Sequence, residues 1–457
     1  MSGEMSEKRT DRTGDATPGR GLGRRDLLRT AAGVALVGSV GVSGASAGRS
    51  EPPGDERWTA PVGGVEASPA VSGESVYAGS HNANLHALDR ETGEERWSFG
   101  EGATRRSSPT VVDGTVYVGS FEGTVFAVDA ESGEEEWQYG TDGGVFTSPA
   151  VVDGTVYVGS RDTSVYALDA GNGDEVWSFG TGGEVWGSPT VVDGTVYVGS
   201  SDSVLYALDA EDGSSVWEFE SSSVIQSGAT TVVEDTVYFS ALRLHAVDRN
   251  NGEERWNARF TGDVKGSVAV VDGTVFVGDS AGSVVALDGA NGNETWSFET
   301  GDTIWASPAV TEGTVLIGSE DDHVYALDAG DGAEQWRYDT GGRANGSPTV
   351  AGGTVFVGSD AGVVALETGF ATETPGADET DTPAETESPA TPTAADATPT
   401  DSGFQETATP DDGDPTPTET DTEAATDAGG PGFGVAATIA GLGGAGYLLG
   451  RHPDDER

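Results

Sequence analysis

One position that varies within an otherwise repeated sequence carries side chains that could bind a ligand. It lies two residues before the serine of a recurring Ser-Pro pair. In successive copies of the repeat it is occupied by Glu66, Arg106, Phe146, Trp186, Ser227, Lys265, Trp305 and Asn345. The fifth copy contains a one-residue insertion, so Ile225 is an alternative to Ser227. Cations beside aromatic rings can hold an anionic or aromatic ligand through charge and cation–π attraction.

The order of these residues predicts which of them oppose each other. If eight copies form a ring, copies two and six lie opposite, so we expect Arg106 to face Lys265. By the same argument Phe146 faces Trp305. Lysine occurs elsewhere only at Lys8, which sets Lys265 apart. The alternative is that these side chains vary because nothing constrains them, and both interpretations remain open.

Other residue sets that would support catalysis or metal binding are not apparent. His86 and His245 replace the Tyr found at the same place in other copies, which indicates packing residues, whereas His81 and His323 fall at or beside loops. The sequence has no cysteine, which excludes disulfides, thiolate catalysis and Cys-ligated metals. Neither a Ser/His/Asp set nor metal-ligand spacing is visible. We therefore predict no catalytic residue and no metal site.

The charge of the chain is strongly acidic. It has 77 Asp and Glu against 23 Lys and Arg, a formal net charge of −54. Nucleic-acid binding needs a basic surface, so we expect no nucleic-acid partner. The acid-rich, lysine-poor composition resembles that of proteins from extremely halophilic archaea, whose charge is screened by molar salt. An ordinary acidic surface protein is the alternative.

The elements that position these residues come from a repeat of about 40 residues marked by tryptophan. One unit, 108–140, contains four extended segments separated by turns, and Asp113-Gly114 is a two-residue hairpin signal. Four strands in such a period are typical of one propeller blade. The repeated tryptophans, which we expect to be structural, are Trp58, Trp97, Trp137, Trp177, Trp217, Trp256, Trp296 and Trp336.

The number of copies predicts an all-β, eight-bladed propeller. The second strand of the unit begins eight times, at Val76, Val116, Val156, Val196, Val237, Val275, Val315 and Val355. The eighth copy has no tryptophan after it, whereas Trp58 has no blade before it. We therefore expect the strand that holds Trp58 to complete blade eight, which closes the ring and removes an exposed sheet edge. An open solenoid is the alternative.

Seven copies share the spacing Ala-x-Asp-x-x-x-Gly-x-x-x-Trp, as in residues 167–177, and the eighth is divided between Ala365 and the pair Gly54 and Trp58. This motif resembles the tryptophan-docking motif of the pyrroloquinoline-quinone (PQQ)-like β-propeller family, over residues 54–369. In such a motif Asp bonds the turn backbone, Gly adopts a left-handed conformation and Trp covers the neighbouring blade.

The resemblance is compatible with either an enzymatic or a non-enzymatic function. The family includes quinone-dependent alcohol and sugar dehydrogenases, and also non-enzymatic propellers such as the bacterial outer-membrane assembly lipoprotein. The enzymes add long insertions between blades, a calcium site, a catalytic Asp and often adjacent cysteines, whereas the blades here are minimal and cysteine is absent. PQQ and calcium are therefore cofactors that only the resemblance implies. Fold alone does not carry the activity.

The N-terminus has the order of features of an export signal. Arg24-Arg25 precedes an apolar run that ends at a small-residue cleavage site, Ala45-Ser46-Ala47. The paired arginines resemble a twin-arginine signal, so we expect residues 1–47 to be a signal peptide cleaved after Ala47. A basic tail with a short helix is the alternative.

The C-terminus is predicted to contain a stalk and an anchor. Residues 371–430 are rich in Thr, Pro and acidic residues and lack Lys and Arg, which predicts disorder.

Residues 431–457 begin with Pro431-Gly432-Phe433 and continue as an apolar run just long enough for a transmembrane helix. The tripeptide, stalk and apolar run resemble the archaeal sorting signal processed by archaeosortases, which implies that the helix is exchanged for a lipid. The acidic tail 454–457 departs from that signal.

Together these observations favour an exported binding or scaffold propeller, anchored on the extracellular face of the membrane and monomeric. Its partner would be a protein or a small anionic or aromatic ligand. The alternatives are a PQQ-dependent dehydrogenase and a sensor head for a small ligand.

The salt dependence of folding tests the halophilic interpretation. Lowering the salt from molar to about 0.1 M lengthens the Debye length from about 3 to 10 Å. A chain with a net charge of −54 should then repel itself and unfold. Circular dichroism along a salt titration measures this, and a full β-sheet signal at the low-salt end would contradict the interpretation.

Overall fold

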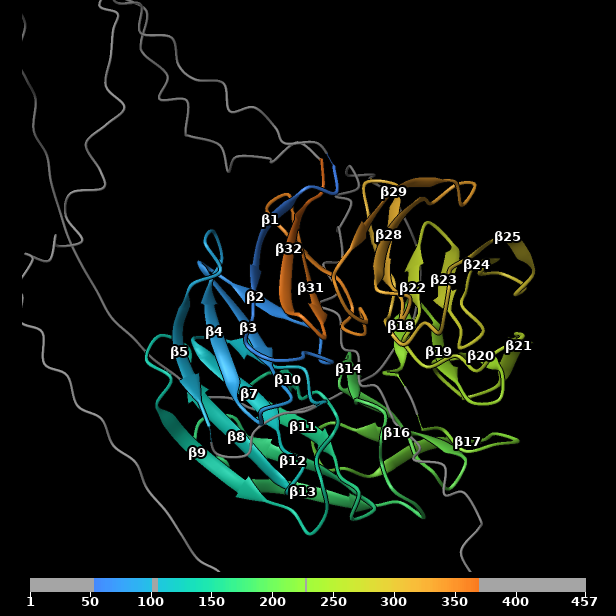
Figure 1. Cartoon of the computed structure of the whole chain (residues 1–457). Coiled ribbons are helices and arrows are strands. Elements are labelled where there is room, and N and C mark those ends of the chain that lie inside the picture. Colours follow the sequence, from blue (N-terminus) through green and yellow to red (C-terminus); the bar gives the residue numbers. More distant parts are fainter. Residues whose placement is uncertain (1–52, 101–105, 227, 370–457) are drawn as a thin grey trace, which may run out of the picture. The chain divides into compact units, whose positions relative to one another are not determined.

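The computed structural model describes residues 53–100, 106–226 and 228–369, which form eight four-stranded antiparallel sheets arranged as the blades of an all-β propeller (Figure 1). The prediction of an eight-bladed propeller is confirmed. No helix in these described ranges is long and apolar enough to cross a membrane. The predicted signal peptide 1–47, stalk 371–430 and sorting signal 431–457 lie outside the described residues.

The first four blades each use four strands that are consecutive in sequence. Blade 1 contains β2 (Ala70–Ser72), β3 (Ser75–Gly79), β4 (Leu85–Asp89) and β5 (Glu95–Phe99). Blade 2 contains β6 (Thr110–Val112), β7 (Thr115–Gly119), β8 (Thr124–Asp129) and β9 (Glu135–Gly140). Blade 3 contains β10 (Ala150–Val152), β11 (Thr155–Gly159), β12 (Ser164–Asp169) and β13 (Glu175–Gly180). Blade 4 contains β14 (Thr190–Val192), β15 (Thr195–Gly199), β16 (Val204–Asp209) and β17 (Ser215–Glu220).

Blades 5 to 7 repeat this order, and blade 8 borrows its outer strand from the start of the chain. Blade 5 contains β18 (Thr231–Val233), β19 (Thr236–Ser240), β20 (Leu244–Asp248) and β21 (Glu254–Ala258). Blade 6 contains β22 (Ala269–Val271), β23 (Thr274–Gly278), β24 (Ser283–Asp288) and β25 (Glu294–Glu299). Blade 7 contains β26 (Ala309–Thr311), β27 (Thr314–Gly318), β28 (His323–Asp328) and β29 (Glu334–Asp339). Blade 8 contains β30 (Thr349–Ala351), β31 (Thr354–Ser359), β32 (Gly362–Glu367) and β1 (Glu56–Ala60).

Local sequence explains the strands and their turns. The two middle strands of each blade are rich in Val, Leu and Tyr and are buried on both faces, whereas the outer strand alternates between exposed and covered positions. The hairpin between β6 and β7 turns at Asp113 and Gly114, with φ angles of 49° and 86°. Both residues take the positive φ that a two-residue hairpin turn requires, as predicted from this pair.

The inner strands close the ring through a chain of serine hydrogen bonds. The N–H of Ser68 donates to Ser108 Oγ at 3.0 Å, and equivalent contacts link the other neighbouring blades, except blades 4 and 5, until Ser347 N–H donates to Ser68 Oγ at 3.2 Å. Blade 5 has Ala229 in place of the serine, and Ala229 N–H donates onward to Ser267 Oγ at 2.7 Å. The serine of the repeat therefore joins neighbouring blades around the channel.

The N-terminal strand completes blade 8, as predicted from the unpaired Trp58. Strand β1 pairs with β32 antiparallel, and Trp58 lies opposite Ala365, just as Trp97 lies opposite Ala87 in blade 1. Gly54 N–H also donates to Glu367 O at 2.8 Å. The described propeller is therefore closed by pairing its two ends (Figure 1), and the solenoid alternative is wrong.

A docking tryptophan locks each blade onto the next. The indole N–H of Trp177 donates to Ala210 O of blade 4 at 3.0 Å, and its ring covers Gly213 so closely that a Cβ there would lie 2.7 Å away. The positive φ of Gly213, 72°, independently favours glycine. In the same way Trp336 lies against Gly54, the glycine of the divided eighth motif.

Loss of the closing tryptophan should destabilise the whole ring. Trp58→Ala should cost about 3–5 kcal/mol of unfolding free energy, the same as Trp177→Ala, because both side chains are more than nine-tenths buried between blades. Denaturant unfolding in molar salt measures the cost. Val176→Ala is the control, since Val176 is 52% exposed beside Trp177 and should change stability by less than about 0.5 kcal/mol. A small loss of unfolding free energy for Trp58→Ala, beside a large loss for Trp177→Ala, would contradict the view that Trp58 stabilises the closure of the ring.

Candidate functional site

Two sets of loops meet on one face of the propeller, which we call the mouth face. One set enters the first strand of each blade, and the other joins the second strand to the third. Backbone hydrogen bonds tie them together: Arg161 N–H donates to Gly144 O at 3.0 Å, and Ser201 N–H donates to Glu184 O at 2.9 Å. Residues that vary in either set therefore come together at this face.

An aromatic cluster on the mouth face spans blades 2 to 4 and consists of Phe121, Phe146, Trp186, Arg106 and Arg161. The rings of Phe146 and Trp186 are stacked, with centroids 5.3 Å apart. The Arg161 guanidinium lies 4.7 Å from the Trp186 ring and 5.4 Å from that of Phe146, and Arg106 lies 6.0 Å from the ring of Phe146. These distances are those of cation–π contacts.

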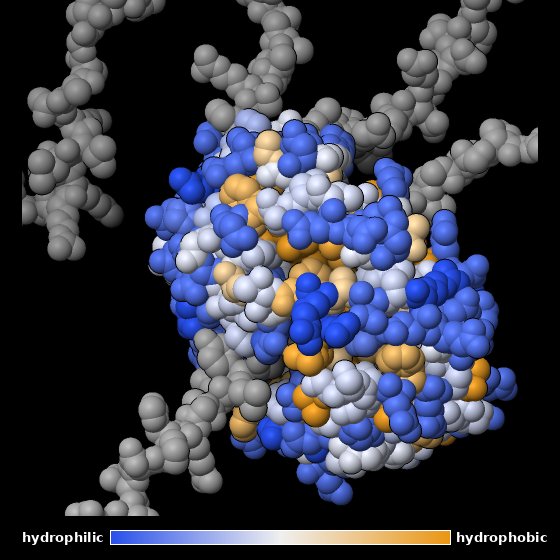
Figure 2. Space-filling view, turned by 90° about the vertical axis from the view of Figure 1, so that its right-hand side faces the viewer, coloured by the Kyte–Doolittle hydropathy of each residue, from blue (hydrophilic) through white to orange (hydrophobic). Residues whose placement is uncertain are grey.

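The outer edge of this aromatic cluster is open to solvent. Phe121 is 58% exposed, while its ring centroid lies 5.3 Å from that of Phe146. Figure 2 shows that hydrophilic residues cover most of one side of the described domain, with hydrophobic residues gathered between them. Phe121 is therefore an exposed phenylalanine that is backed by packed rings.

Carboxylates offset the charge of both arginines in the aromatic cluster. Arg161 pairs with Glu184 at 3.1 Å, and the same carboxylate accepts the Trp186 indole N–H at 2.9 Å. Arg106 lies 3.7 Å from Glu66, which also pairs with His81 at 2.9 Å. Because each guanidinium has a carboxylate partner, the cluster presents fixed donors and rings rather than an excess of positive charge.

The other predicted residues lie on blades 6 to 8. Lys265 Nζ lies 5.7 Å from the Trp305 ring and pairs with Asp263 at 3.1 Å. Asn345 is 5% exposed, and its buried Oδ1 accepts no hydrogen bond from the described residues. The structure thus groups the candidates as Glu66 and Arg106 with Phe146 and Trp186, and Lys265 with Trp305.

Blade 5 departs from the register expected at this position. Ser227 lies outside the described residues. The alternative, Ile225, is 2% exposed, and its N–H makes the same contact to the preceding blade as that of Val185. Ile225 is therefore a core residue and not a rim residue. Gln226 follows it as Trp186 follows Val185, because the insertion comes after this point.

The loop positions of Phe121 and Arg161 were not among the predicted site residues. They follow the serine that recurs between the second and third strands in most blades. The residue at this position varies among the copies of the repeat: His81, Phe121, Arg161, Ser201, Leu242, Ser280, Glu320 and Asp360. Variation among the copies of the repeat at this second loop position could therefore have identified Phe121 and Arg161 from the sequence. The sequence prediction used only the loop that enters each blade, although both loops lie at the mouth face.

The structure brings together a serine, a histidine and a carboxylate that the sequence analysis did not recognise. Ser80 Oγ lies 3.0 Å from His86 Nε2, and His86 Nδ1 lies 2.8 Å from Glu95 Oε2. The order of contacts is that of a hydrolase triad. Ser80, however, has no exposed surface and His86 only 4%, so a substrate cannot reach them, and the predicted packing role of His86 fits this burial.

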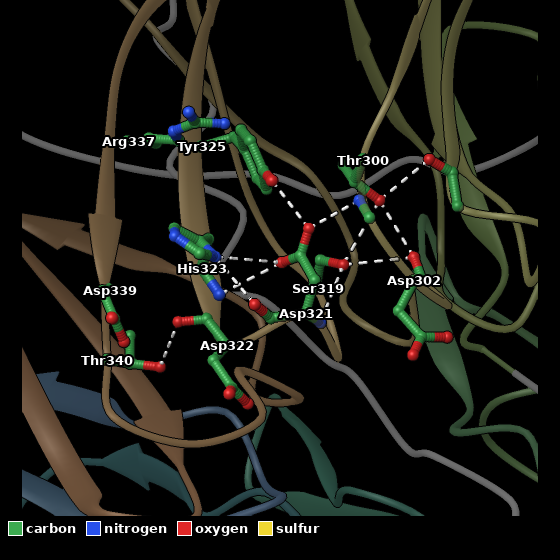
Figure 3. Close-up of polar contacts among 12 residues, drawn as sticks. Thr300, Asp302, Ser319, Asp321, Asp322, His323, Tyr325, Arg337, Asp339 and Thr340 are labelled. Atoms are coloured by element: carbon green, nitrogen blue, oxygen red, sulfur yellow. Dashed lines mark hydrogen bonds and ion pairs between the residues drawn. The ribbon is translucent and has the colours of Figure 1, made fainter.

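A second polar network, in blade 7, stabilises a loop (Figure 3). Asp321 accepts hydrogen bonds from the Tyr325 hydroxyl and the Gly301 N–H, both at 2.6 Å, and from the His323 N–H at 3.1 Å. Burial raises the pKa of Asp321, but these donors outweigh it, so the pKa falls below its ordinary value. Burial and the same contact raise the pKa of Tyr325 to about 12. Asp202 and Tyr206 form the equivalent contact in blade 4.

The described residues do not match a quinone enzyme's calcium site. No group of three or more His, Cys, Asp or Glu side chains converges anywhere in residues 53–100, 106–226 and 228–369. Calcium takes six to eight oxygen ligands, mostly from such carboxylates. The side chains of the described residues therefore do not fit a calcium ion of this kind.

The fold and this surface define a repeat propeller with a candidate binding face. A family model described as outer membrane protein assembly factor BamB matches residues 44–148, 123–263 and 240–394. The chain belongs to this family of PQQ-like repeat propellers. A second model, the PGF-CTERM motif, matches residues 430–452 and is consistent with a membrane-associated protein of the cell surface. No curated protein matches significantly.

Solved structures share the fold at low sequence identity. BamB from Moraxella catarrhalis is 20% identical, with a TM-score of 0.58 over 66% of this chain and 96% of that one. The computationally designed Ika8 protein is 19% identical, with a TM-score of 0.62 over 69% and 99%. Quinohemoprotein alcohol dehydrogenase from Comamonas testosteroni is 16% identical, with a TM-score of 0.60 over 70% and 77%. At these identities the likeness concerns the fold alone.

The pH dependence of stability tests the role of the Asp321 network. Asp321→Asn should lower the unfolding free energy at neutral pH by about 1–3 kcal/mol, because its donors lose a charged acceptor. The folded pKa of Asp321 lies below its ordinary 3.8. Its contribution is therefore complete above that value and is lost as the pH falls through the lowered pKa. Denaturant unfolding of both proteins along an acid series measures this, and a difference that already closes near neutral pH would contradict it.

Proposed function

We propose that this protein is a binding propeller held at the outer face of the cell membrane, and that it recognises its partner through the aromatic cluster on the mouth face. The observation that carries the proposal is the exposed Phe121, supported by the stacked pair Phe146 and Trp186, both of whose rings Arg161 contacts. Aromatic and arginine side chains dominate the energetics of protein interfaces, because they bury a large area at little entropic cost.

The packing of the aromatic cluster supports binding over a passive surface. Phe146 is 5% exposed, and the Arg161 side chain is held by Glu184 and by two rings. A partner that covers Phe121 therefore meets groups that are already ordered, so association costs little side-chain entropy. The paired carboxylates keep the patch close to neutral within a chain of net charge −54, which lets an acidic partner approach.

The sequences of the two termini support the proposed location at the outer face of the membrane. The predicted twin-arginine signal would export the folded propeller, and the PGF-CTERM match at 430–452 supports attachment by the C-terminus. The acidic stalk 371–430 would then hold the propeller away from the membrane, so that the mouth face is accessible to an extracellular protein or a small anionic or aromatic ligand.

An enzymatic function has weaker support. The dehydrogenase alternative rests on the fold, which also occurs in BamB. Among the described residues the calcium donor set is missing and the Ser80 group is closed to substrate.

Cross-linking in intact cells tests the proposed binding face. A photoreactive phenylalanine analogue at position 121 should form a discrete cross-linked species, because this side chain would lie inside the interface. The matched control is position 242, since Leu242 is 51% exposed in the equivalent loop of blade 5. Arg161→Gln, combined with the analogue at 121, should reduce the yield by removing the cation that contacts both rings. Equal yields at 121 and 242 would overturn the proposal.

A further inference from the structure

Blade 5 contains a pocket beside its loop between β19 and β20. The pocket has a volume of about 280 Å³ and lies between the end of β17 in blade 4 and strands β20 and β21 of blade 5. The loop before β20 is short: Ser240 pairs with Leu244, whereas the equivalent pair in blade 1 is Gly79 and Leu85. Two residues are thus absent from this loop, and the pocket opens beside it.

In blade 4 the loop that corresponds to the shortened loop of blade 5 contributes a carboxylate. In blade 4 the loop places Asp202 where its carboxylate accepts the Tyr206 hydroxyl at 2.7 Å and the Gly182 N–H at 2.6 Å. Blade 5 has no counterpart of Asp202, and His245 replaces the tyrosine. Ser222, the counterpart of Gly182, lines the pocket instead.

His245 lines this pocket and has an unsatisfied ring nitrogen. The residue is 5% exposed, and its Nδ1 lies 2.7 Å from Glu254 Oε1. Because a carboxylate accepts, Nδ1 carries the proton, and Nε2 of the neutral ring is left as an acceptor. Nε2 is buried and has no hydrogen-bond partner among the described residues. Such a group is costly to leave without a donor.

Blade 1 provides an internal comparison for this histidine. His86 occupies the same strand position, and its Nδ1 lies 2.8 Å from Glu95, as in the pair of His245 and Glu254. In blade 1 the Ser80 hydroxyl lies 3.0 Å from His86 Nε2, so both ring nitrogens of this histidine have a partner. Blade 5 has Ala241 at the position of Ser80. The group that fits His245 Nε2 is therefore a hydroxyl, which the chain itself does not supply.

We propose that the blade 5 pocket binds a neutral saccharide unit, one hydroxyl of which donates to His245 Nε2 in the place that the Ser80 hydroxyl takes in blade 1. The remaining wall suits such a ligand. Glu220 and Asn257 offer acceptors and donors for further hydroxyls, and the half-buried Phe219 offers a ring face for the carbon side of a sugar.

Size and charge narrow the choice of ligand. A pocket of about 280 Å³ is at the lower end of the range for small-molecule sites, which suits a single sugar ring. Two carboxylates, Glu220 and Glu254, face one cation, Arg243, so an anion is disfavoured. Arg243 is held to Asn257 by an exposed hydrogen bond of 2.5 Å. Movement of this side chain gives the ligand access to the buried nitrogen.

Titration of the full chain in molar salt with the methyl glycosides of glucose, galactose and mannose tests the proposal. The side-chain nitrogen resonances of histidine, observed by NMR, should show a saturable shift of His245 Nε2 with at least one of them. His245→Phe should weaken binding about tenfold or more, because the acceptor is lost. Ala241→Ser, which keeps the histidine, should also weaken it about tenfold while raising the melting temperature, because the new hydroxyl takes the place of the ligand.

The matched controls lie in blade 1. His86→Phe and Ser80→Ala alter the equivalent group on another blade and should leave glycoside binding unchanged. The absence of any saturable shift, which would mean that only water enters the pocket, would overturn the proposal. So would tighter binding of glucuronate than of the neutral sugars, or equal losses in the blade 1 variants. This site is separate from the aromatic cluster, so Arg161→Gln should not affect it.

Discussion

Each blade depends on its neighbour through one tryptophan, which lies over the neighbour's glycine and donates its indole N–H to the neighbour's backbone. A single four-stranded sheet cannot bury its own faces, and the hydrophobic clusters accordingly combine residues of two adjacent blades, such as Tyr157 and Trp177 of blade 3 with Val196 and Leu208 of blade 4. The contact works only if glycine leaves room for the indole, as at Gly213. Because each tryptophan joins one blade to the next, the pairing of β1 with β32 gives every blade two neighbours and leaves no blade at an end of the array.

This constraint leaves the loops of the mouth face as the part of the propeller that can vary. Their backbones are fixed by the same interblade hydrogen bonds in most blades, so a change of side chain there does not disturb the fold. Phe146 and Trp186 are rigid for that reason: they project from connections whose neighbouring residues, Val145 and Val185, are fully buried. An exposed aromatic surface of this kind, in a strongly acidic chain, is the feature on which the proposed binding role rests.

Blade 5 shows what happens where the repeat is broken. It lacks the serine that links the inner strands, it carries an insertion before β18, and its loop before β20 is shortened. The polar groups that fill the corresponding space in blades 1 and 4 are absent, and His245 remains with one ring nitrogen unsatisfied. Departures from local consistency of this kind commonly occur at functional sites. In blade 1 the equivalent histidine differs, because both ring nitrogens of His86 have partners, Ser80 and Glu95.

The sequence alone determined the architecture: four strands per unit, eight units, and a ring closed by the strand of Trp58. It could do so because turn chemistry, strand alternation and docking spacing are local properties that recur with one period. The tertiary structure decided which side chains meet. Arg106 pairs with Glu66, Arg161 contacts the rings of both Phe146 and Trp186, and Ser80 reaches His86. The first two contacts join the loops of neighbouring blades, so they depend on how the ring brings those loops together, which no spacing within a single repeat specifies. Ser80 and His86 are only six residues apart, but their contact depends on how the loop between β3 and β4 turns back on the strand.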